Sequence, residues 1–283
     1  MSLSRNTLKS AFRDADLMPH VKPGPPSEPI NPEFIQLVLN QYKKFKCKIQ
    51  KMHWILNMNA SKLYVPYNKI ESVYNLIGIK QKEKKNPVSE YYSEYEALLP
   101  NTIWHIDIHF FNKVQKLPVF GIIDDKSRFL LALKILPSKS SSETVKVAKK
   151  AIDTYGEPFC FWSDNGKENE GEFSNFLMEN DIQIRKTLPH MPRQNGKIEK
   201  LWPSLEKNIP DDFELKDIQN ILDEFRFNYN NVPNGALPKK GYCPMTPTQC
   251  FNAFKKWRRG DEAKWKKKRK MDFGKLKRFQ KFN

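Results

Sequence analysis

Cysteine is scarce in this sequence, and no apolar run is long. The chain has four cysteines in 283 residues, and no two of them stand at the close spacing of a zinc-binding pair. They are Cys47, Cys160, Cys243 and Cys250. The amino-terminal region offers only His20 and His53 beside Cys47, so we predict no structural zinc. The scatter favours reduced thiols in an intracellular protein, and we expect neither a membrane span nor a secretory signal.

Acidic residues are too few to balance the basic ones. Lysine and arginine number 49 against 32 aspartates and glutamates, which gives a formal net charge of +17 and an isoelectric point near 9.6. Such a surplus favours a nucleic acid or another acidic partner. Residues 1–95 hold 15 basic and 8 acidic residues, residues 96–210 hold 16 and 15, and residues 255–283 hold 14 and 3. Basic flanks could bind phosphate groups and so bring the near-neutral central segment to them. The alternative is that lysine-rich faces keep the protein soluble.

Three carboxylates in that centre stand in contexts that favour catalysis. Asp107 lies in an apolar run that predicts a buried strand, where a lone carboxylate is costly unless it meets a cation or hydrogen-bond donors. Asp164 ends a second apolar run before Asn165 and Gly166, a strand end of the kind that presents catalytic residues. Glu199 opens a segment with apolar residues at helical spacing. Taken singly, each has a structural alternative: a sheet-end acid, a turn and a residue that complements a helix dipole.

The segment from about residue 101 to 208 resembles the catalytic core of retroviral integrases and related cut-and-paste transposases, the DDE family with a ribonuclease H-like fold. The matching motifs are Trp104-x-x-Asp107, Ile123-Asp-Asp-x-Ser-Arg128, Asp164-Asn-Gly166 and Pro192-x-x-Asn-Gly-x-x-Glu199. The 34 residues between Asp164 and Glu199 are close to the family's usual spacing. Two features depart from the pattern: Asn234 stands where a histidine commonly follows proline, and the segment after Asp-Asn-Gly is longer.

The resemblance implies both a reaction and a site. Asp107, Asp164 and Glu199 would be the catalytic residues and the ligands of two Mg²⁺ or Mn²⁺ ions, for the cleavage of DNA ends and their transfer into target DNA. The partners would be double-stranded DNA and further copies of the chain. Candidate DNA contacts near the third acid are Asn195, Gly196, Lys197 and Lys200, for which a solvated helix face is the alternative. We expect the three carboxylates to converge on one pocket, and Asp125, in a turn, to be dispensable.

The order of predicted elements agrees with an α/β fold of this type. Strands are predicted at 102–110, 117–124, 128–136, 158–163 and 181–187, and helices at 143–155, at 171–180 and around Glu199. Short polar turns between the first three strands imply antiparallel pairing, whereas the fourth must cross over a helix. The prediction is a ribonuclease H-like mixed five-stranded sheet flanked by helices, with a helical amino-terminal region.

The flanks divide into four further regions. We predict a disordered tail at 1–30, a helical unit at 31–95 that resembles a helix-turn-helix DNA-binding module, a helical extension at 211–254 and a basic, aromatic-rich tail at 255–283 around the catalytic core at 96–210. In the last tail, Lys266, Lys267, Lys268, Arg269 and Lys270 form either a nuclear import signal or a phosphate-binding run. The protein would thus be nuclear in a eukaryotic host.

Three functions remain open from the sequence. The first is an active integrase or transposase. The second is a domesticated DNA-binding protein that keeps the fold, and the third is a ribonuclease H-like nuclease without joining activity. The intact acids argue against the second, and the Asn-Gly loop with the basic aromatic tail argues against the third.

Overall fold

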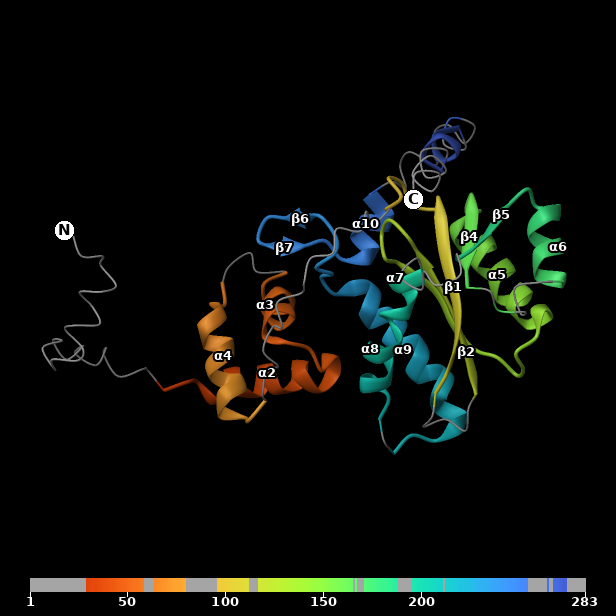
Figure 1. Ribbon diagram of the computed structural model, residues 1–283. Coiled ribbons are helices and arrows are strands. Elements are labelled where there is room, and N and C mark those ends of the chain that lie inside the picture. The colour runs from red at the N-terminus through yellow and green to blue at the C-terminus, as the bar shows by residue number, and fades with distance from the viewer. Residues whose placement is uncertain are drawn as a thin grey trace, which may run out of the picture.

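The computed structural model describes residues 29–58, 64–79, 96–111, 117–164, 166, 171–187, 195–210, 212–253, 264 and 267–273. Residues 1–28 of the predicted tail and most of 255–283 lie outside these ranges. Figure 1 shows a central sheet with helices packed against it and a smaller helical unit beside it. None of the helices in the described ranges is both long and apolar enough to cross a membrane.

The sheet is the predicted mixed five-stranded sheet. Its strands are β1 (Ile103–Phe110), β2 (Pro118–Asp124), β3 (Leu130–Ile135), β4 (Cys160–Ser163) and β5 (Gln183–Lys186), in the order β3-β2-β1-β4-β5 (Figure 1). The first three pair antiparallel, while β4 runs parallel to β1 and β5 runs parallel to β4. This topology confirms the predicted ribonuclease H-like fold, with β4 and β5 shorter than expected from the sequence.

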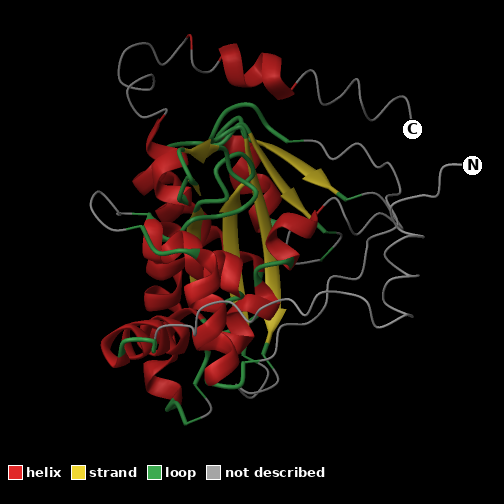
Figure 2. Cartoon of the chain, turned by 90° about the vertical axis from the view of Figure 1, so that its left-hand side faces the viewer, coloured by secondary structure: helices red, strands yellow, loops and turns green. Residues whose placement is uncertain are grey.

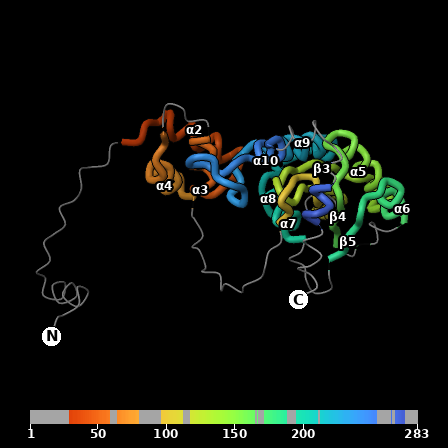
Figure 3. The backbone as a smooth tube through the Cα atoms, turned by 90° about the horizontal axis from the view of Figure 1, so that it is seen from above, coloured from red at the N-terminus to blue at the C-terminus, as the bar shows by residue number. Residues whose placement is uncertain are grey.

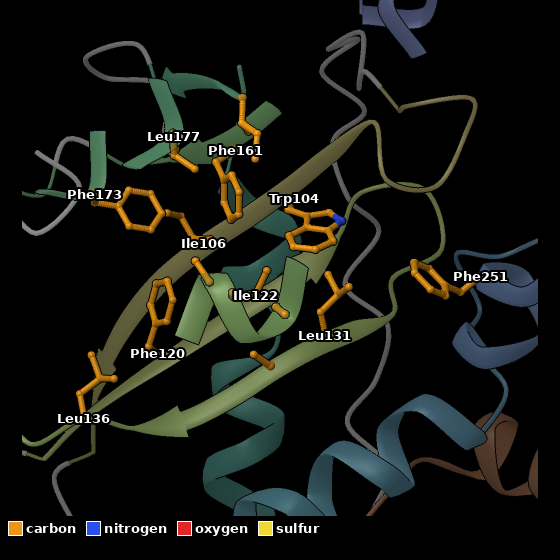
Figure 4. Packing of buried hydrophobic residues seen from close by; sticks show 14 residues of the cluster. Trp104, Ile106, Phe120, Ile122, Leu131, Leu136, Phe161, Phe173, Leu177 and Phe251 are labelled. Carbon is orange, nitrogen blue, oxygen red and sulfur yellow. The ribbon is translucent and has the colours of Figure 1, made fainter. Parts of the chain in front are cut away.

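Helices cover both faces of the sheet, as the side view in Figure 2 shows. The core helices are α5 (Ser141–Tyr155), α6 (Glu172–Glu179), α7 (Gly196–Glu199), α8 (Trp202–Asn208) and α9 (Ile218–Asn231), and the short helix η3 (Leu215–Asp217) precedes the last. The strands alternate their side chains between the faces. Trp104 and Ile106 of β1 join the core under α5 and α6 (Figure 4), so His105 and Asp107 point toward α7 and α8.

The amino-terminal unit has a small core of its own. It consists of α2 (Pro32–Phe45), α3 (Ile49–Asn57) and α4 (Tyr67–Leu76), and Figure 3 shows it beside the sheet. Asn31 caps α2, with Pro32 in the first turn, as the sequence indicates. Lys46 then adopts a left-handed conformation that ends α2, and α3 follows as a separate helix. The DNA-binding role of this unit stays a prediction.

The extension at 211–254 is not purely helical. After α9 it forms a two-stranded hairpin of β6 (Lys239–Lys240) and β7 (Cys243–Pro244), followed by α10 (Pro247–Ala253). The hairpin packs against the amino-terminal unit, because the Cys243 thiol donates to the Trp54 carbonyl at 3.6 Å and a Cβ on Gly235 would lie 3.0 Å from the Trp54 ring. The extension therefore connects the amino-terminal unit to the core.

The described part of the basic tail is docked on the core, which corrects the expectation of a phosphate-binding run at Arg269. Residues 267–273 are helical, and Arg269 is buried, donating to the carbonyl oxygens of Asn101 and Glu157. Asp272 accepts from the backbone N–H of Leu98 and from the Thr102 hydroxyl. The guanidinium of Arg269 is therefore occupied inside the protein.

Candidate active site

Asp107 lies at the middle of β1, on the face covered by α7 and α8. Its Oδ2 accepts the indole N–H of Trp202 at 2.7 Å. Burial raises the pKa of Asp107 to about 6; the Trp202 hydrogen bond opposes this rise, and the charges of Asp164 and Glu199 add to it. Asp107 is therefore a partly buried carboxylate whose pKa is raised by the charges of the other two predicted acids.

Trp202 is a site residue that the sequence did not reveal. Gly121 pairs with Asp107 across β1 and β2, and a Cβ at Gly121 would lie 2.9 Å from the Trp202 ring. The glycine therefore leaves the space in which the indole reaches the carboxylate. His109 stacks on the same indole at 5.1 Å and bonds to Glu206 of α8. The spacing in the sequence could have pointed to Trp202. It stands three residues after Glu199, which is about one helical turn and places both on a similar side of a helix.

Asp164 follows the end of β4, at the level of Asp107. The two strands run parallel with His105 opposite Trp162, and Asp107 and Asp164 each lie two residues further along. Asp164 is exposed, and its Oδ1 accepts the backbone N–H of Gly166 at 3.0 Å. This local bond holds the carboxylate just beyond the carboxyl end of β4, where the sequence predicts a strand end.

Glu199 ends α7 and is exposed. Its neighbour Ile198 is buried against Gly121 and anchors the helix to the sheet. Partial burial raises the pKa of Glu199, and the charge of Asp164 adds to the rise. The charge of Asp164 thus raises the pKa of both other acids of the predicted triad, and the charge of Glu199 raises that of Asp107, so the three lie within electrostatic reach on one side of the sheet.

The residue types fit a divalent cation of the Mg²⁺ class. Three carboxylates that repel one another supply hard oxygen donors and an excess of negative charge, which a cation would relieve. Within the described ranges, however, no three acidic, histidine or cysteine side chains stand close enough to form a ready-made metal site. The arrangement is therefore an open one, in which Trp202 bonds one oxygen of Asp107 and Glu199 lies at the surface.

The residues predicted to contact DNA near Glu199 divide into two groups. Asn195 is 1% exposed, and its amide bonds to His105 and to the carbonyl of Ile106. Lys197 forms an ion pair with Asp125. These two polar ends are engaged inside the protein, which corrects the expectation that they face DNA. Lys200 is exposed and Gly196 is half-buried, so their contact with DNA stays a prediction, as it does for Lys267, Lys268 and Lys270, while Lys266 lies outside the described residues.

Asp125 was expected to be a dispensable turn residue, and the structure contradicts this. It is 1% exposed, its Oδ1 is bonded to His105 and Lys197, and its Oδ2 accepts the N–H of Ala97 at 2.7 Å. Burial alone would raise the pKa of Asp125, but the His105 hydrogen bond and the Lys197 charge outweigh burial and hold the pKa well below its ordinary range. The turn is therefore fixed to three other segments through the Asp125 carboxylate. Its polar sequence did not reveal these contacts.

Comparisons with known proteins agree with this geometry. Residues 94–232 match the family model described as integrase core domain. A chain of the simian T-cell lymphotropic virus intasome in complex with PP2A regulatory subunit B56 gamma is 19% identical, with a TM-score of 0.52 over 76% of this chain and 72% of that chain. This likeness shows a shared fold. The comparison with curated proteins found no match.

Two integrase catalytic core domains are also similar over a shorter span. The HTLV-2 domain in complex with magnesium is 24% identical, with a TM-score of 0.42 over 56% of this chain and 99% of that chain. The BIV domain is 16% identical, with a TM-score of 0.45 over 56% of this chain and 98% of that chain. The family match, the strand order and the motifs around the three acids together identify residues 94–232 as an integrase core domain of the ribonuclease H-like superfamily.

Proposed function

We propose that this protein cleaves DNA ends and joins them to target DNA by metal-dependent phosphoryl transfer. The observation that carries the proposal is the placement of Asp107 and Asp164 at one level of two adjacent parallel strands, with Glu199 near enough for its charge to raise the pKa of Asp107. In an integrase core, bound divalent cations would offset the electrostatic repulsion between carboxylates placed in this way. Of the three, Asp107 is the one whose burial is costly unless it meets a cation or hydrogen-bond donors.

The chain's own residues divide the work of the site. Asp107 would hold both of two cations, and Asp164 and Glu199 would hold one each. When bound, the two Mg²⁺ or Mn²⁺ ions would activate the attacking water or DNA 3′-hydroxyl and stabilise the leaving oxygen. Trp202 holds the Asp107 carboxylate in one orientation, and Ile198 holds the helix of Glu199 on the sheet.

The partners follow from charge and from the reaction. The net charge of +17 supports DNA as the substrate, and joining two ends calls for at least two copies of the chain. We further propose a nuclear location in a eukaryotic host, where the run at 266–270 would serve as an import signal. Because Arg269 is buried, that role would depend on the lysines of the run.

The proposal is tested with strand-transfer assays on candidate terminal repeats, taken from inverted repeats in the DNA that flanks the gene. Asp107→Asn and Asp164→Asn keep size and polarity but remove the charge that holds a cation. Cleavage and joining should fall together by at least about 100-fold while DNA binding persists. Asp153→Asn is the matched control, because Asp153 is an exposed residue of α5.

Each of the three functions left open by the sequence gives a different result in this assay. Cleavage with joining supports the proposal. Cleavage without joining would identify a nuclease, and DNA binding with neither reaction would identify a domesticated binding protein. Equal loss in Asp153→Asn would instead point to a general fault in folding.

A further inference from the structure

A buried polar network lies on the same face of the sheet as the three acids, and the proposed reaction does not use it directly. At its centre is His105, two residues before Asp107 and therefore on the same face of β1. Its Nδ1 lies 3.0 Å from Oδ1 of Asn195, and its Nε2 lies 2.7 Å from Oδ1 of Asp125. His105 is 2% exposed and its two partners 1% each, so little solvent competes for these contacts.

Asp125 ties this network to two other parts of the chain. It lies in the turn after β2, and Oδ2 accepts the N–H of Ala97 from the segment that leads into β1. The amine of Lys197, on α7, donates to Oδ1. One carboxylate thus joins the turn, the lead-in segment, β1 and the helix that carries Glu199.

The first half of α7 is held at two points. Asn195, the residue just before the helix, bonds to the His105 ring and also donates from Nδ2 to the carbonyl of Ile106 at 3.1 Å. Lys197, inside the helix, pairs with Asp125. Because α7 is a single turn that ends at Glu199, fixing its first residues also fixes where the third acid stands.

His105 also contacts the strand that leads to the second acid, Asp164. Its ring stacks on Trp162 of β4 at 5.8 Å and 24°. Trp162 is two residues before Asp164, and Asn195 is four residues before Glu199. A single imidazole is therefore close, along the chain or in space, to the backbone segment of each acid.

A buried ionic network is a poor way to gain stability alone. Bringing charged groups out of water is costly, and well-packed apolar side chains often stabilise a fold equally well or better. Such a network has a clearer use where a site needs a fixed geometry, since supporting hydrogen bonds hold the residues that do the chemistry.

We infer that His105, Asp125 and Asn195 are positioning residues that set where α7 places Glu199 relative to Asp107 and Asp164. This inference rests on the proposed function, because the placement of the acids matters only if they act together. The three residues have no direct contact with substrate in this role.

The test uses the full-length chain and the variants Asp125→Asn and His105→Gln. We expect the cleavage rate at saturating DNA to fall about 10-fold to 100-fold, as for other residues that support metal ligands, while the DNA concentration for half-maximal rate stays within about twofold. Mn²⁺ binding, measured by calorimetry without DNA, should weaken by a similar factor. Amide hydrogen exchange should speed up in α7 and stay unchanged in α5.

Two further proteins control for loss of stability. Asp125→Asn removes the carboxylate that pairs with the largely buried Lys197, so the double variant Asp125→Asn with Lys197→Met removes the lysine charge as well. The double variant should regain thermal stability but not rate or Mn²⁺ affinity. Asp153→Asn should match the wild type in every measurement.

The outcomes separate the inference from the proposed function. Wild-type rates and Mn²⁺ affinities in both single variants would overturn the inference and leave the function standing. A double variant that regained rate together with stability would also overturn it, because the network would then be structural alone. A wild-type protein that neither bound Mn²⁺ nor cleaved DNA would overturn the proposed function, and the inference with it.

Discussion

The indole N–H of Trp202 donates to Oδ2 of Asp107 at 2.7 Å. This bond joins the segment just after Glu199 to the strand of the first acid. Gly121 stands opposite Asp107 on β2, and the indole occupies the space above it. The position of the Glu199 segment relative to Asp107 therefore depends on Gly121, whose lack of a side chain makes room for the indole.

Gly121→Ala should destabilise the protein by about 1–3 kcal/mol, because the new methyl group would stand 2.9 Å from the Trp202 ring and force the buried helix away from the sheet. Urea unfolding measures the change. Gly196→Ala is the matched control, since its Cβ would meet nothing within 4 Å and the change should stay within about 0.5 kcal/mol. Equal effects of the two substitutions would show that Trp202 does not depend on Gly121.

Asp125→Asn should cost stability in a pH-dependent way. The pKa of Asp125 in the folded protein lies well below its ordinary value, so its ionised form contributes stability that is fully present above the unfolded pKa, about 4, and is lost as the pH falls toward the folded pKa. The difference in unfolding free energy between wild type and variant should therefore be constant from about pH 5 to 7 and shrink below about pH 4. A difference that did not change with pH would exclude the ionised carboxylate as its source.

A divalent cation should stabilise the folded protein. Mn²⁺ that binds the folded chain and not the unfolded one raises the free energy of unfolding by about 2.7 kcal/mol at 100 times its dissociation constant. Thermal unfolding with and without Mn²⁺ measures this effect. Asp107→Asn should unfold at the same temperature in both conditions, and a shift as large as that of the wild type would place the cation elsewhere.

Truncation after Arg259 would remove the docked helix at 267–273 together with most of the basic tail. Loss of Asp272 alone leaves the N–H of Leu98 and the Thr102 hydroxyl without their acceptor, so Asp272→Ala should cost about 1–3 kcal/mol. The truncated chain should lose at least as much, as measured by urea unfolding. Lys267→Ala, at an exposed position, should change stability little.

The same truncation also tests the role of the tail in DNA binding. It removes most of the 14 basic residues after position 254, so the slope of log affinity against log salt should flatten. An unchanged slope would show that the tail does not contact phosphates. The two readouts are independent, because stability depends on the docked helix and the salt slope depends on charge.

The sequence by itself determined the secondary structure of the core and singled out the three acids as candidates. Strand and helix periodicity are local properties, and residue types at a strand end or in a helix's first turn are visible in a short window. Short turns predicted the antiparallel pairing of the first three strands, and the helix after the third strand predicted a crossover to the fourth. These features need no knowledge of which distant residues meet.

Only the tertiary structure decided which polar side chains are buried and what they bond to. Trp202 lies 95 residues from Asp107, Asn195 lies 90 from His105, and Asp272 lies 170 from Thr102. A polar residue in a turn or a basic tail looks solvated in sequence, because burial depends on the elements that the fold brings over it. For this reason Asp125, Asn195 and Arg269 looked like surface residues in the sequence, whereas the fold buries them inside the integrase core domain.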